Sequence, residues 1–165
     1  MRLDPGLRFS NHAAVATLLV SGVIWLVADQ LKASENGEMW QAIAANMLML
    51  HGMTAMVALI LLGAMIPLHV HRSWRAGKNR FTGSLMVATN TVLIITASGL
   101  YYAGSDLLRA FVADVHIVAG LVVPALIVTH IALGRRARTF RRMHSEPAQI
   151  AGLRAVTFSE GPGSR

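Results

Sequence analysis

The chain has 165 residues, of which 54% are hydrophobic and 14% are charged, and its formal net charge is +7. Soluble domains carry about a quarter charged residues, so this composition excludes an ordinary water-soluble globule and indicates a small membrane protein in contact with lipid. The basic residues lie between apolar runs rather than on one polar surface, which argues against nucleic-acid binding.

Four apolar runs follow one another along the chain, and each can form a helix that crosses a bilayer. A hydrocarbon core about 30 Å thick requires about 20 helical residues. The runs cover residues 12–28, 44–70, 83–103 and 111–134. We therefore predict an all-α fold, an integral membrane four-helix bundle formed by residues 1–140. Residues 141–165 show no sustained hydrophobic period, which indicates a loose C-terminal tail.

The lysines and arginines between the runs predict the orientation of the bundle. All but two of the fifteen lie in the N-terminal segment, between the second and third runs, or after the fourth run. The exceptions, Lys32 and Arg109, lie in the two other connections. Because positive charge concentrates in cytoplasmic segments, both termini and the C-terminal tail are expected in the cytoplasm.

Histidine is the residue type left for metal chemistry, because the chain contains no cysteine. His51 lies near the outer end of the second run, at a depth comparable with His116 in the fourth. His116 and His130 are separated by a rise of about 21 Å and by about 40° around one helix. Ionisable residues in a membrane usually mark a functional site, and two facing neutral imidazoles suit the axial positions of a haem iron.

Three histidines are candidates for the inner partner of His130. His12 lies at the inner end of the first run, His69 at the inner end of the second, and His71 just beyond it. On a straight helix His69 lies on the same face as His51, five turns away, so geometry alone pairs His69 with His130. The rise between His51 and His69 is however about 27 Å, against about 21 Å on the fourth helix, so the two pairs would not lie level. His71 points about 200° from the His51 face and is the weakest candidate.

The segments RFSNHAAVATLLVSG, LHGMTAMVALILL, VHIVAG and VTHIALGRR carry four of these histidines. In this pattern the chain resembles the bacterial family of four-helix dihaem cytochromes b, which includes the cytochrome b subunits of formate dehydrogenase and of nickel–iron hydrogenase. The resemblance implies that residues 1–140 are a transmembrane cytochrome b domain. It also implies His12 and His130 as ligands of an inner haem b, and His51 and His116 as ligands of an outer haem b.

The resemblance also implies a function for the chain. It would carry electrons across the bacterial inner membrane, as a multi-pass subunit, between a periplasmic redox partner and the quinone pool. The partner would be a dehydrogenase, an iron–sulfur subunit or a c-type cytochrome, and Asn79 and Arg80 would contact the quinone. No catalytic residue is expected, because the loops are too short for a catalytic domain and the substrate chemistry would belong to the partner. A haem-free membrane anchor or assembly subunit of a redox complex is the alternative.

Overall fold

Long helices make up most of the chain in the computed structural model. The structure describes residues 4–77 and 80–159, and for residues 137–159 it describes the backbone alone. The elements in chain order are α1 (Pro5–Leu31), α2 (Gly37–Met65), the π-helical turn η1 (Ile66–Val70), α3 (His71–Arg75), α4 (Arg80–Tyr102) and α5 (Asp106–Ser159). No strand occurs in the described residues, so the predicted all-helical fold is confirmed.

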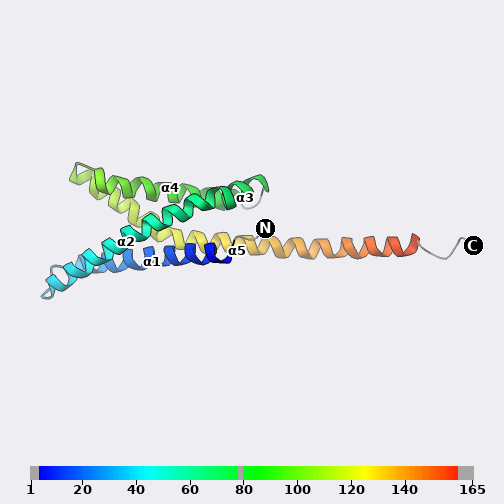
Figure 1. Cartoon of the computed structure of the whole chain (residues 1–165), viewed down its shortest axis with the longest axis horizontal. Helices are drawn as coiled ribbons and strands as arrows, with labels where there is room; N and C mark the ends of the chain where they lie inside the picture. Colours follow the sequence, from blue (N-terminus) through cyan, green and yellow to red (C-terminus); the bar gives the residue numbers. More distant parts are fainter. Residues whose placement is uncertain (1–3, 78–79, 160–165) are drawn as a thin grey trace, which may run out of the picture.

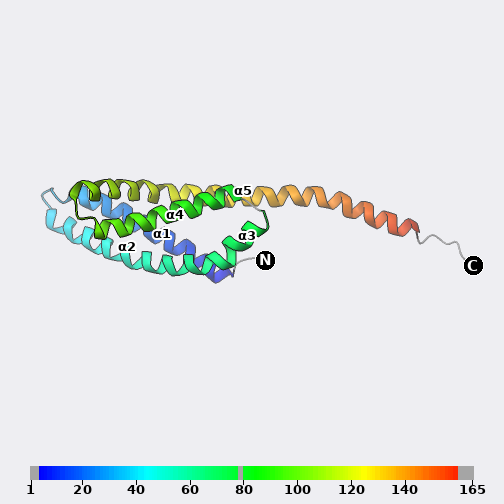
Figure 2. The same ribbon diagram turned by 90° about the horizontal axis from the view of Figure 1, so that it is seen from above.

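The helices form two antiparallel hairpins that lie beside each other (Figure 1). Close backbone contacts join α1 with α2 and α4 with α5, and a smaller contact joins α1 with α5. The two short connections, residues 32–36 and 103–105, lie at one end of the bundle. The N-terminus and the segment formed by η1 and α3 lie at the other end, which we call the inner end (Figure 2).

Capping residues determine where two of the long helices begin. The Asp4 carboxylate accepts a hydrogen bond from the Leu7 N–H at 3.2 Å, and Pro5 occupies the start of α1. The Ser105 hydroxyl accepts from the Leu108 N–H at 3.1 Å at the start of α5. Such caps satisfy backbone donors that have no partner within the helix, so they set the depth at which each helix starts.

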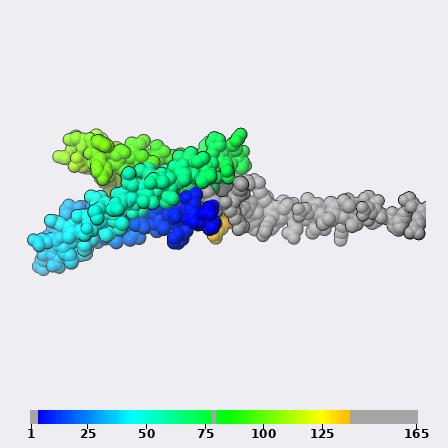
Figure 3. Space-filling model, viewed as in Figure 1, coloured from blue at the N-terminus to red at the C-terminus, as the bar shows by residue number. Residues whose placement is uncertain are grey.

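The large apolar side chains point outward. In the part of the chain with described side chains, the buried residues are few and none is large: Ala14, Ser21, Ala28, Thr96, Ala103 and Val123. Four helical segments are long and apolar enough to cross a membrane. Figure 3 shows the end of α4 near the 103–105 connection standing apart from the α1–α2 hairpin. An exterior of this kind suits contact with lipid, as the composition predicted.

Helix α5 continues well past the apolar run, to Ser159 (Figure 2). The expectation of a loose segment after residue 140 is therefore wrong for the backbone up to Ser159. A helix that has already formed in the apolar run extends at little cost, because nucleation is the expensive step. The segment also contains several alanines and arginines, which are good helix formers.

Candidate functional site

Two histidines from different hairpins face each other across the bundle. His51 lies on α2 and His116 on α5, and their ring centroids are 6.3 Å apart with an angle of 71° between the ring planes. We call these residues the outer pair. The structure thus brings together the two histidines that the sequence placed at a common depth.

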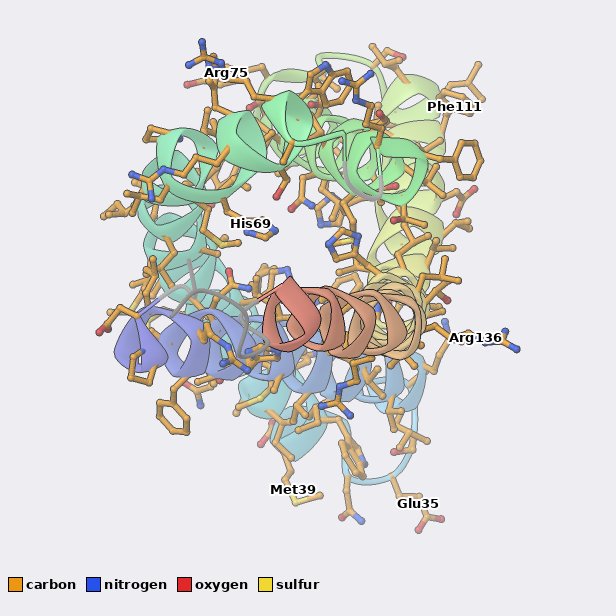
Figure 4. All side chains as sticks on the ribbon, turned by 90° about the vertical axis from the view of Figure 1, so that its right-hand side faces the viewer. Glu35, Met39, His69, Arg75, Phe111 and Arg136 are labelled. Atoms are coloured by element: carbon orange, nitrogen blue, oxygen red, sulfur yellow. The ribbon has the colours of Figure 1, made fainter. Side chains whose placement is uncertain are left out.

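A second pair of imidazoles lies toward the inner end of the bundle. His69 of η1 and His130 of α5 have ring centroids 6.3 Å apart and ring planes at 78°. In Figure 4, a view along the bundle, His69 points into the space that the helices enclose. We call these residues the inner pair. Along α5, His130 lies about 21 Å from His116 of the outer pair.

The structure does not bring His12 to His130. His12 is exposed on α1, and its Nδ1 lies 2.5 Å from the backbone oxygen of Arg8, one turn earlier. In the part of the chain with described side chains, no imidazole faces His12. The geometry therefore favours His69, the alternative inner ligand, over the residue that the family resemblance implied.

A π-helical turn explains how His69 reaches this position. Pro67 has no N–H to donate to the preceding turn and its ring crowds that turn, so the α-helical pattern of α2 ends at Met65. At the end of η1 the His71 N–H bonds to the Ile66 oxygen, five residues back. A π-turn holds more residues per turn than an α-turn. The rise and the facing direction calculated for a straight helix therefore do not apply to His69.

Each imidazole of the outer pair is held from behind by a buried hydroxyl. Ser21 Oγ on α1 lies 3.1 Å from His51 Nδ1, and Thr96 Oγ1 on α4 lies 2.9 Å from His116 Nδ1. Ser21 is 1% exposed and Thr96 is 8% exposed. In both cases Nδ1 is occupied by a residue of the neighbouring helix in the same hairpin, which leaves Nε2 as the nitrogen available for a ligand.

The inner end carries a similar hydroxyl and Arg80, one of the two predicted quinone contacts. Thr82 Oγ1 on α4 lies 2.9 Å from His130 Nδ1. Arg80 is exposed, and its Nε and Nη2 donate to the Trp74 backbone oxygen at 3.2 and 3.1 Å. Arg80 thus closes the turn after α3, while Asn79 lies outside the described residues. The sequence analysis missed the hydroxyl of Thr82, as it missed those behind the outer pair.

Glycines leave room beside the outer pair. A Cβ on Gly22 would lie 3.5 Å from His51 Cε1, so α1 passes close to this ring. A Cβ on Gly52, next to His51, would have no neighbour within 4 Å, and the same holds for Gly120, one turn after His116. A Cβ at Gly52 or Gly120 would therefore enter open space in the haem-free chain.

The spacing of the pairs suits a metal ion between two imidazoles. A metal–nitrogen bond of about 2 Å on each side, with each ring centroid about 1.1 Å beyond its nitrogen, predicts a centroid separation of about 6.2 Å. Both pairs have a separation of 6.3 Å. Among the described residues no group of three or more histidine or acidic side chains could hold a metal ion. Two ligands alone suit an iron whose other positions are filled by a porphyrin.

Comparison with known proteins finds no relative of the chain. The chain matches no protein-family model, no curated protein and no solved structure. A functional conclusion therefore depends on the chemistry of the two imidazole pairs, on their position in an apolar bundle and on the depth that separates them.

Proposed function

We propose that the chain is a membrane-bound dihaem cytochrome b subunit that transfers electrons between a periplasmic redox partner and the quinone pool. The observation that supports the proposal is that the rings face each other in two histidine pairs, each with its ring centroids 6.3 Å apart. When bound, haem b supplies a one-electron iron couple. A dehydrogenase, an iron–sulfur subunit or a c-type cytochrome would serve as the partner.

The residues present fit two haem groups. His51 and His116 would hold the outer group, and His69 and His130 the inner group. Open space beside Gly52 and Gly120 supports the placement of a flat ring at the outer pair. Neutral imidazole nitrogens are the donors that b-type iron uses, and the apolar surroundings suit the macrocycle.

The fold supports passage of electrons along the membrane normal. Helix α5 contributes one ligand to each pair, and its rise of about 21 Å between His116 and His130 separates the two centres by much of an apolar core. The connections 32–36 and 103–105 are too short to hold a catalytic domain. Substrate chemistry would accordingly lie in a partner, and the quinone would bind near the inner end.

Haem content and visible spectra test the proposal. The full chain is purified in detergent and its dithionite-reduced minus oxidised spectrum is recorded, with haem quantified as the pyridine haemochrome. Two haems b per chain are expected in the wild type, and one in each of the His116→Ala and His130→Ala variants. The His71→Ala variant is the control, because His71 is exposed and outside both pairs.

Two further variants identify the inner ligand. Loss of one haem in His69→Ala with both retained in His12→Ala is expected from the geometry, and the reverse result would restore the ligand set that the family resemblance implied. A folded wild-type chain that takes up no haem when supplied with it would refute the cytochrome function. In that case a haem-free membrane anchor or assembly subunit would be the better explanation of the apolar helices.

A further inference from the structure

We propose that Ser21 and Thr96 are positioning residues that fix the tautomer of the outer pair, so that Nε2 of both His51 and His116 is an unprotonated ligand nitrogen. The tautomer itself follows from the hydrogen bonds of the two hydroxyls. Its use for iron rests on the proposed function, and the experiment below separates the two.

The proton of the Ser21 hydroxyl is committed to its own helix. Ser21 Oγ lies 2.7 Å from the Thr17 oxygen and 3.2 Å from the Leu18 oxygen. A backbone carbonyl only accepts hydrogen bonds, and a hydroxyl has one proton, so that proton points to α1. Ser21 Oγ must then accept from His51 Nδ1 across 3.1 Å. His51 therefore carries its proton on Nδ1, and Nε2 has a free lone pair.

Thr96 repeats the arrangement in the other hairpin. Its Oγ1 lies 2.7 Å from the Val92 oxygen and 3.2 Å from the Leu93 oxygen, so its proton also bonds to its own helix. The hydroxyl oxygen accepts from His116 Nδ1 at 2.9 Å. Two hydroxyls on two different helices thus impose the same tautomer on two rings that face each other.

Burial makes this choice of tautomer energetically strong. In the part of the chain with described side chains, Ser21 and Thr96 are the buried polar residues. An N–H or a hydroxyl left without a partner in an apolar environment is costly, so the opposite tautomer is disfavoured. Thr91 and Ser98 make the same bond to their own helix, but both are exposed and neither holds an imidazole.

The hydrogen bond behind each ring also affects the electronic character of the ligand. An imidazole that donates from Nδ1 is a more basic donor through Nε2. A more basic ligand stabilises ferric iron relative to ferrous iron and lowers the reduction potential. Removing either hydroxyl is therefore expected to raise the potential of the outer centre and to leave that of the inner centre in place.

Nitrogen NMR on the haem-free chain tests the tautomer without any cofactor. The full chain is labelled with ¹⁵N-histidine, and signals are assigned by their loss in His51→Ala and His116→Ala. The wild type is expected to show protonated Nδ1 and bare Nε2 at both residues. Ser21→Ala is expected to give a tautomer mixture at His51 alone and Thr96→Ala at His116 alone, whereas Thr96→Ser should restore the wild-type signal.

Redox titration of the haem-loaded chain provides the second readout. Ser21→Ala and Thr96→Ala are each expected to raise one of two midpoint potentials, and the matched control Thr91→Ala to change neither. A wild-type signal from protonated Nε2, or tautomers unchanged by both alanine variants, would overturn the proposal. Correct tautomers in a chain that binds no haem would refute the dihaem function and leave the positioning role of the hydroxyls intact.

Discussion

In the proposed function, replacing Gly120 by phenylalanine is expected to weaken binding of the outer haem while the fold and the inner haem remain. Gly120 lies one turn after His116, on nearly the same face of α5, and a Cβ there would meet no atom within 4 Å. The haem-free chain therefore has room for a Cβ at this position. In the proposed function, the outer haem would lie beside His116 on this face, so it would compete with the phenylalanine ring for the same space.

The size of the effect follows from the cost of overpacking. Extra atoms forced into a filled site cost about 1–3 kcal/mol, which corresponds to a roughly 5- to 140-fold weaker association. In the haem-free chain the substitution is expected to favour folding, because glycine in a helix interior is less favourable than most residues, by up to about 1 kcal/mol against alanine. Weaker haem binding with undiminished thermal stability of the haem-free chain is the expected combination.

Haem titration into the haem-free chain measures both sites. The wild type should bind two equivalents, and Gly120→Phe should bind the equivalent with the outer midpoint potential roughly 5- to 140-fold more weakly and the other one with wild-type affinity. Gly63→Phe is the matched control, because Gly63 is exposed on α2 and also has no neighbour within 4 Å. Two equivalents bound by Gly120→Phe with wild-type affinity, or equal losses in both variants, would refute the reasoning.

Three further predictions concern packing and the inner centre. A Cβ on Gly99 would lie 3.1 Å from Val112 Cγ1, so Gly99→Ala is expected to lower the thermal midpoint of the chain in detergent, at a cost of about 1–3 kcal/mol. Gly83→Ala should leave the midpoint unchanged, because a Cβ there has no neighbour within 4 Å. Equal midpoints in the two variants would contradict the close α4–α5 contact. Thr82→Val removes the hydroxyl behind His130, so the inner midpoint potential should rise while the outer one stays constant, and a shift of the outer potential alone would argue against this placement. In the proposed function, the steep inclination of the ring planes in both pairs predicts low-spin ferric EPR signals with a strongly anisotropic g tensor. Rhombic signals typical of parallel rings would disagree with the geometry.

The sequence predicted the helices and the outer pair well, because both depend on simple regularities. Apolar length identifies a spanning helix, and the depths of His51 and His116 follow from their positions in adjacent runs. The inner partner was harder to predict. A straight-helix estimate placed His69 too far along the axis, and the family resemblance pointed to His12. The π-turn at Pro67 is a local backbone change that this estimate did not include.

The hydroxyls behind the rings were missed for a different reason. The third apolar run contains several hydroxyl side chains, and Thr91, Thr96 and Ser98 all look alike in sequence. Only the packing of α4 against α5 shows that Thr96 faces an imidazole while the other two are exposed. The extension of α5 to Ser159 was also missed, since the sequence after residue 140 shows no sustained hydrophobic period.

The two hairpins have a consequence for how the molecule is made. Each imidazole pair takes one ring from the α1–α2–η1 half and one from α5, yet few backbone contacts join the halves directly. In the proposed function, each bound haem would join the two halves and add to the few direct contacts between them. Cells starved of haem would be expected to accumulate a less stable chain, a substrate for membrane proteases. Cofactor supply would thereby control the amount of the protein as well as its redox competence.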